Sequence, residues 1–262
     1  MSLFAIGGMG PMMAGIYMTG ITKGRKGLNR LGNRLVDPQR IKGKWWWTIV
    51  LFFPLLILMA TLIYNYLPAF QNENALNTSQ ALHMVRRPWE LLYFMGFVLL
   101  LGPLPEEIGW RGFALDALQQ RWNALLASLL LGAGWAAWHI PLFFIKNYFT
   151  ETGYSPNPIL YMYDIIIVSI LFTWIYNHSN FSILAAILFH FMLNFTGEFL
   201  VPNNQVRVIQ SVLLTLTALI IVLAFGPRKL CKTKWRKQNR RKVQSEDRNN
   251  TARQPHAPLS KI

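Results

Sequence analysis

The chain has 262 residues, of which 53% are hydrophobic and only 14% are charged, whereas a soluble domain carries about a quarter charged residues. This composition argues against a soluble protein. The single cysteine, Cys231, excludes an internal disulfide and a cysteine-rich zinc site.

Most of the positive charge lies in two clusters. Eight of the 26 Lys and Arg residues lie in 23–44 and twelve lie in 228–262. Basic clusters beside apolar spans mark the cytoplasmic side of a membrane and attract anionic lipids. We therefore expect anionic headgroups near residues 23–44 and 228–242. No nucleic acid is expected as a partner, because no recognition motif accompanies the charge.

The apolar segments predict an all-α, polytopic bundle of transmembrane helices, with about seven spans in a range of six to eight. In chain order the spans are 3–22, 46–67, 90–117, 122–146, 159–177, 180–200 and 207–226. Six of them separate the two basic clusters, and this even number places both clusters on one side. We expect a transmembrane domain over 1–227 and a basic, disordered cytoplasmic tail over 228–262.

The third span contains an interruption. Gly102-Pro103-Leu104-Pro105 should break the helix, and Pro105 suits the first turn of a new one. Glu106 and Glu107 then fall in that first turn, where the positive end of the helix dipole favours a carboxylate.

Six polar residues stand within the apolar spans: Glu106, Glu107, Arg111, His139, His190 and Asn194. A charge at the centre of a bilayer costs from roughly 3 to over 10 kcal/mol, which makes such residues candidates for function. Three spans contribute these groups, and their residue types are those of acid–base chemistry.

Helix geometry sorts the two acids. Glu107 and Arg111 are four residues apart, so they share a face and can pair. Glu106 lies about 100° away around the helix and faces another neighbour. We interpret Glu107 and Arg111 as a structural pair and Glu106 as the chemical group.

The two histidine helices allow structural as well as functional interpretations. Small residues at Ala124, Ser128, Gly132 and Ala136 predict close packing against another helix. His139 should lie on that packed face, where it either takes part in chemistry or only hydrogen-bonds to a neighbour. Asn194 shares a face with His190 and could equally make an interhelical hydrogen bond.

These residues resemble the CAAX protease and bacteriocin-processing family of intramembrane proteases, which includes the Ras-converting CAAX endopeptidases. The Glu-Glu-x-x-x-Arg motif of the family matches residues 106–111, and His-x-x-x-Asn matches 190–194. The Phe-x-x-x-His motif matches 135–139, where Trp135 replaces Phe, and this departure keeps an aromatic ring and leaves the resemblance intact. The resemblance covers about residues 89–200 and implies a bacterial plasma membrane as the location.

The resemblance also implies a mechanism. Glu106 and His139 would activate a water molecule, His190 and Asn194 would stabilise the oxyanion, and Glu107 with Arg111 would orient the site. A metal-free reaction is expected, with no cofactor. The alternative is a zinc ion held by Glu106, His139 and His190, although no His-Glu-x-x-His motif is present.

The substrate class implied is a hydrophobic peptide or membrane-protein segment, including prenylated CAAX peptides. Two other functions stay open. One is a catalytically silent membrane scaffold or bacteriocin-immunity protein. The other is an ion-coupled transporter that uses Glu106 as its ion site, although such transporters have repeated helix breaks and only one is evident here.

Overall fold

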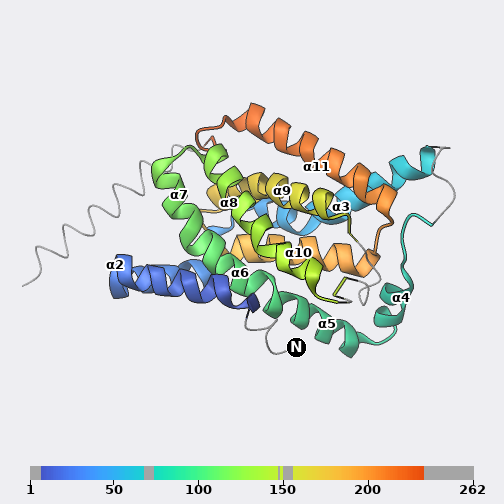
Figure 1. Cartoon of the computed structure of the whole chain (residues 1–262), viewed down its shortest axis with the longest axis horizontal. Coiled ribbons are helices and arrows are strands. Elements are labelled where there is room, and N and C mark those ends of the chain that lie inside the picture. The colour runs from blue at the N-terminus through green and yellow to red at the C-terminus, as the bar shows by residue number, and fades with distance from the viewer. Residues whose placement is uncertain (1–6, 68–73, 147, 150–155, 233–262) are drawn as a thin grey trace, which may run out of the picture. The chain divides into compact units, whose positions relative to one another are not determined.

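The computed structural model describes residues 7–67, 74–146, 148–149 and 156–232, and helices dominate these segments (Figure 1). The α-helices are α2 (Gly10–Val36), α3 (Lys44–Tyr66), α4 (Ser79–Val85), α5 (Pro88–Leu101), α6 (Pro103–Gly109), α7 (Leu115–Arg121), α8 (Ala124–His139), α9 (Pro158–His178), α10 (Ile183–Leu200) and α11 (Asn204–Phe225). A π-helical turn, Trp110–Ala114, joins α6 to α7. The all-α prediction is confirmed.

Six helical segments of the described chain are long and apolar enough to cross a membrane. They correspond one to one with the six spans predicted between the basic clusters. The segments are Lys44–Tyr66, Pro88–Arg121, Ala124–Phe144, Pro158–His178, Ile183–Leu200 and Asn204–Phe225. Their number, length and apolar composition are those of an integral membrane protein.

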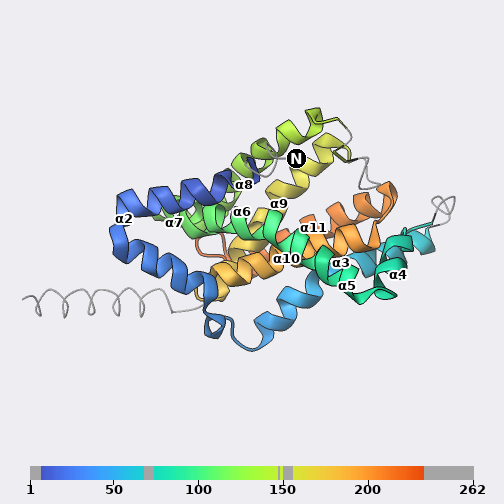
Figure 2. The ribbon, with the colours of Figure 1, turned by 90° about the horizontal axis from the view of Figure 1, so that it is seen from below.

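The first predicted span, 3–22, has different bounds in the structure. Residues 1–6 lie outside the described residues, and the helix that follows continues through the basic segment as far as Val36. It kinks at Gly24, where φ is 59° and ψ is −163°, a conformation that glycine adopts without a Cβ penalty. Figure 2 shows the two arms of α2 on either side of this kink. Lys and Arg are good helix formers, so the basic residues do not end the helix.

The predicted interruption in the third span is confirmed. α5 ends at Leu101, and Gly102 has non-helical angles of φ −122° and ψ −85°. The new helix begins at Pro103, so Pro105 and Glu106 lie in its first turn as predicted, whereas Glu107 lies just beyond that turn. Leu115 N–H then bonds to Trp110 O, five residues earlier, which is the wide turn of a π-helix. Such turns recur at functional sites.

The core lies among α3, α8, α9, α10 and α11. α8 approaches α9 closely, because a Cβ on Gly132 would lie 2.9 Å from Ile166 Cα. The small residues Ala124, Ser128 and Ala136 are buried along the same helix, as their spacing predicts. The first residues of the predicted tail also belong to this bundle: Leu230 is fully buried. The rest of the tail, from 233, lies outside the described residues.

Candidate active site

The Glu107–Arg111 pair lies at the centre of the polar cluster. Arg111 Nη1 donates to Glu107 Oε1 at 2.7 Å, and neither side chain is exposed. Arg111 Cζ lies 4.7 Å from the ring centroid of Trp135 and 4.2 Å from that of Phe172. The ion pair expected from the spacing is therefore confirmed, and two aromatic faces give the guanidinium further cation–π stabilisation.

His190 of α10 joins this pair from a different helix. Its Nδ1 lies 2.9 Å from Glu107 Oε1. An ionised carboxylate only accepts hydrogen bonds, so Nδ1 carries a proton there. The rings of Trp135 and Phe172 lie 5.1 Å and 5.6 Å from the imidazole. Glu107 thus links the acidic helix to α10 and fixes the orientation of the His190 ring.

Glu106 faces a different neighbour, as its position around the helix predicts. Trp135 Nε1 donates to Glu106 Oε2 at 2.6 Å, and Glu106 is only 6% exposed. A phenylalanine at position 135 could not donate this bond. The replacement of Phe by Trp therefore adds a hydrogen bond that holds the Glu106 carboxylate, a role that the presence of an aromatic ring alone did not predict. The sequence contains a signal for this bond: Trp135 lies four residues before His139 on the same helical face, and an indole N–H can only donate a hydrogen bond.

Asn194 lies on the other side of this carboxylate. An ideal Cβ on Gly102 would stand 3.4 Å from Asn194 Nδ2 and 3.9 Å from Glu106 Oε1. The amide and the free carboxylate oxygen therefore border the same small volume beside the helix break. A side chain at Gly102 would extend into that volume, so glycine at the helix break keeps the space open.

His139 is placed by the helix that carries Trp135. Its Nδ1 lies 2.8 Å from the carbonyl oxygen of Trp135, and a carbonyl can only accept, so Nδ1 is the protonated nitrogen of the ring. In the neutral imidazole, Nε2 then keeps its lone pair for a water molecule or a substrate proton. The rings of Trp138 and Tyr161 pack against it at 5.0 Å and 5.7 Å.

Five of the six predicted residues therefore gather around Trp135, directly or through the Glu107–Arg111 pair, and Asn194 joins them beside Gly102 at the helix break. Sequence reasoning missed three contributors: Phe172, Tyr161 and the hydrogen bond from Trp135. Phe172 and Tyr161 lie on α9, which carries no motif, and only the fold shows that this helix packs against the site.

A zinc ion needs three or four donor side chains that converge on one point. Among the residues that the structure describes, no three His, Cys, Asp or Glu side chains are grouped so that they could hold a metal ion. Glu106, His139 and His190 are thus not gathered on one point in the described residues, and the metal-free reaction stays a prediction.

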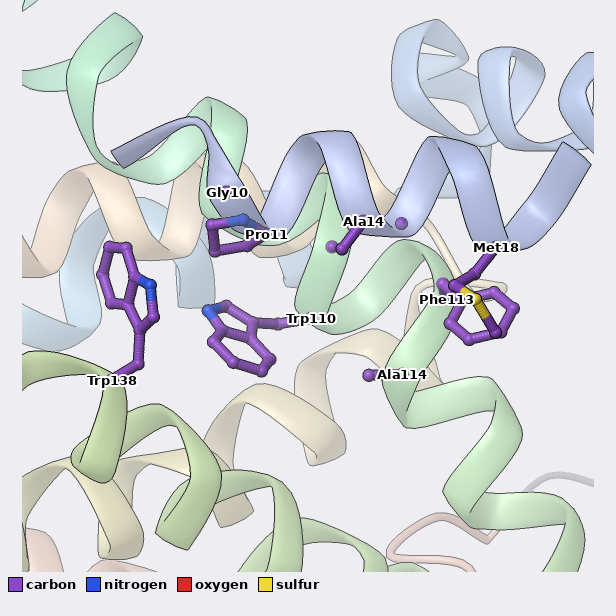
Figure 3. Close-up of a pocket in the computed structure, with 10 residues that line it drawn as sticks. Gly10, Pro11, Ala14, Met18, Trp110, Phe113, Ala114 and Trp138 are labelled. Carbon is purple, nitrogen blue, oxygen red and sulfur yellow. The ribbon is translucent and has the colours of Figure 1, made fainter. Parts of the chain in front are cut away.

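An apolar cavity of about 270 Å³ lies between α2 and the α6–π segment (Figure 3). Pro11 and Ala14 line it from α2, Trp110 lines it from the π-turn, and Trp138 comes from α8. At this crossing the two helices touch through their backbones, because a Cβ on Gly15 would lie 2.8 Å from Gly109 Cα. The N-terminal helix thus packs directly against the helix that carries both acids.

Comparison with known proteins agrees with this geometry. Residues 88–196 match the family model for the type II CAAX prenyl endopeptidase, Rce1-like. We refer to residues 88–196, the segment that is similar to this family model, as the Rce1-like domain. This Rce1-like domain contains all six residues of the polar cluster and excludes α2, α3 and α11.

A curated relative gives the same result. The chain is similar to the CAAX prenyl protease 2 of Methanococcus maripaludis, with 35% identity over 130 residues. The match covers 48% of this chain and 48% of the relative, so the similarity spans about half of each protein. The 130 aligned residues are similar in number to residues 88–196 of the Rce1-like domain.

Proposed function

We propose that the chain is an intramembrane endopeptidase that hydrolyses peptide bonds in membrane-associated or hydrophobic peptides, with prenylated CAAX peptides as its first candidate substrates. The observation that carries the proposal is the convergence of Glu106, His139 and His190 around Trp135, with Asn194 beside the helix break that precedes Glu106, inside the Rce1-like domain. Buried acids, histidines and an amide in one apolar core are costly, and peptide hydrolysis uses each of them.

In the proposed reaction, Glu106 acts as the general base. With His139 Nε2 as a second acceptor, it holds a water molecule and removes one of its protons as the water oxygen attacks the scissile carbonyl carbon. The C–N bond then breaks, and the proton held by Glu106 passes to the leaving amine. Carboxylate and imidazole return to their starting states, so the reaction consumes only water.

His190 and Asn194 are proposed to stabilise the oxyanion that forms on the carbonyl oxygen. Asn194 Nδ2 donates directly. Because Nδ1 already donates to Glu107, donation from His190 to the oxyanion would come from Nε2 and would require a proton on both ring nitrogens. One such donor in a preorganised site contributes about 3–4 kcal/mol to the transition state. Glu107 and Arg111 position His190 and the acidic helix and do not touch the reacting atoms.

The proposed reaction contains no metal ion, and the absence of a His-Glu-x-x-His motif from the sequence supports this choice. Zinc held by Glu106, His139 and His190 remains the alternative mechanism, and it predicts activity that depends on the metal.

We further propose that anionic lipid headgroups contact the two basic clusters. Lys23, Arg25 and Lys26 are exposed on α2, and Arg228 and Lys229 are exposed after α11. An even number of candidate spans separates the clusters, and the positive-inside rule places both on the cytoplasmic side. The chain would then lie in a bacterial plasma membrane with its C-terminal tail in the cytoplasm.

The test is cleavage of a farnesylated CAAX peptide by purified protein in detergent, with the products identified by mass spectrometry. Wild type and Glu90→Gln should release the C-terminal tripeptide, because Glu90 pairs with Arg87 at the end of α5. Glu106→Gln should lose at least ~100-fold in rate, the usual contribution of a general base. In water enriched in ¹⁸O, the new carboxyl group should carry the label.

Two outcomes would overturn the proposal. If wild type releases no product from this peptide, its unprenylated form or an apolar peptide library, the chain is a scaffold, an immunity protein or a transporter. If Glu106→Gln cleaves as fast as wild type, the peptidase site lies elsewhere.

A further inference from the structure

We propose that Arg34, which lies on α2 outside the Rce1-like domain, is a positioning residue that fixes the acidic helix relative to α10. The inference rests on the proposed function for its meaning in catalysis. Its structural basis is a single guanidinium that contacts the π-turn, α7, α9 and the turn between α9 and α10.

The Arg34 side chain uses all three of its nitrogens. Nη1 pairs with Asp116 Oδ2 at 2.7 Å, and the two side chains are only 15% and 23% exposed. Nε donates to Phe181 O at 2.8 Å, and Nη2 donates to Arg111 O at 3.3 Å. Nη2 also contacts the hydroxyl of Tyr176.

Two of these contacts brace the π-turn. The carbonyl of Arg111 lies inside that turn, and Asp116 follows it in the first turn of α7. Arg34 therefore binds one group before and one group after residues 112–114, the last three residues of the π-turn. The side chain of Arg111 extends from the same backbone to hold Glu107, so a shift of the turn would move the Glu107–Arg111 pair.

The other contacts fix the start of α10. Asn180 and Phe181 connect α9 to α10 with positive φ angles of 54° and 57°, a strained conformation for residues other than glycine. Arg34 binds the Phe181 carbonyl in this turn. Tyr176 reinforces the link, because its hydroxyl donates to Asp116 Oδ1 at 2.7 Å.

The two halves held by Arg34 are those that must meet in the site. Glu106 and Glu107 belong to α6, whereas His190 lies two turns after the start of α10. A planar guanidinium can satisfy a carboxylate and two carbonyls at once, and a lysine ammonium lacks that fixed fork. A displacement of about 1 Å can cost ~100-fold in rate. A small shift of the π-turn or of α10 on loss of Arg34 would therefore lower the rate of catalysis.

The activity arm of the test compares wild type, Arg34→Ala, Arg34→Lys, Tyr176→Phe and Arg86→Ala with the farnesylated peptide. Arg86 is an exposed arginine on the C-terminal side of α4 and serves as the control. Arg34→Ala should lower kcat at least ~10-fold while KM changes less than ~2-fold, the pattern of lost alignment. Arg34→Lys and Tyr176→Phe keep most of the packing and should lower kcat less, in the same direction.

The structural arm does not depend on activity. In a Cys231→Ser background, spin labels at Gln120→Cys on α7 and Glu198→Cys on α10 report the distance between the two halves. Both positions are exposed. Arg34→Ala and Arg34→Lys should shift or broaden the distance distribution, and Arg86→Ala should not.

The outcomes separate the two proposals. If wild type cleaves nothing, the proposed function fails, and the spin-label distances alone decide whether Arg34 positions the helices. If wild type cleaves the peptide and the Arg34 variants keep both kcat and the distance distribution, Arg34 is not a positioning residue. A fall in thermal stability without a change in kcat would also overturn the inference, because it would show a merely structural role.

Discussion

Two guanidinium–carboxylate pairs with the same N···O distance connect different parts of this molecule. Arg111 and Glu107 meet at 2.7 Å with no exposure, four residues apart on one helical segment. Arg34 and Asp116 also meet at 2.7 Å, but they are 82 residues apart and partly exposed. The first pair sits inside the site, and the second ties the site to the N-terminal helix.

The two pairs differ in their exposure to solvent, which decides what happens when one partner is removed. A fully buried pair has lost its hydration, so removing one partner strands a charge in an apolar core. A partly exposed pair keeps water as a substitute and contributes less to stability. We therefore expect the inner pair to control folding and the outer pair to control alignment, and the following variants test this contrast.

The largest effect on stability should come from Arg111→Ala. It leaves Glu107 unpaired without exposure to water, and the loss should be about 3–5 kcal/mol of unfolding free energy. Thermal unfolding in detergent measures it, with Arg121→Ala at the exposed end of α7 as the control. The double variant Glu107→Leu with Arg111→Met should recover much of the stability but not the activity. Equal stability of Arg111→Ala and wild type would contradict the buried-pair account.

A second variant concerns the indole that holds Glu106. Trp135→Phe restores the residue of the family motif but removes the donor to Glu106 Oε2. A hydrogen bond to a charged group contributes about 1.5–3 kcal/mol, so kcat should fall while the protein stays folded. Trp138→Phe on the same helix is the matched control, because no hydrogen bond to Glu106 is at stake there. Unchanged kinetics for Trp135→Phe would show that the bond does not position the carboxylate.

The crossing of α2 and α6 provides a third test. A methyl group at Gly15 would lie 2.8 Å from Gly109 Cα and 2.9 Å from Ile108 O, so Gly15→Ala should overpack the contact by about 1–3 kcal/mol. Gly20→Ala meets only Leu28 Cδ1 at 3.9 Å and should leave stability unchanged or slightly higher. Unfolding midpoints of the two variants give the comparison, and equal midpoints would mean that α2 does not bear on the acidic helix.

The smallest effect on stability should come from Asp116→Asn. The outer pair is partly exposed, and pairs with access to solvent contribute about 1 kcal/mol or less. Its kcat should nevertheless fall, because the amide does not hold the Arg34 fork as a carboxylate does. A loss of stability as large as that of Arg111→Ala would erase the contrast between the two pairs.

The parts of the fold that depend on neighbouring residues could be predicted from the sequence. Apolar runs indicate the six spans, Gly102 and Pro103 break the third one, and the spacing of Glu107 and Arg111 sets their pair. All three follow from helix periodicity and backbone chemistry, which act over a few residues.

The remaining features depend on contacts between distant residues. The Arg34–Asp116 pair, the donation from Trp135 to Glu106 and the ring of Phe172 over Arg111 join segments on different helices. A single sequence carries no record of such pairings. The basic residues from Lys23 onward predict the end of a span at residue 22, because charge marks the membrane edge, yet charge does not stop a helix.

The most direct test of the central claim measures the role of Glu106 and of metal together. Initial rates of farnesylated peptide cleavage are recorded for wild type before and after dialysis against a zinc chelator, and for Glu106→Gln at matched stability. We expect wild type to keep its rate after dialysis and Glu106→Gln to lose at least ~100-fold. A wild-type rate abolished by the chelator and restored by zinc, or a fully active Glu106→Gln, would contradict the metal-free glutamate site.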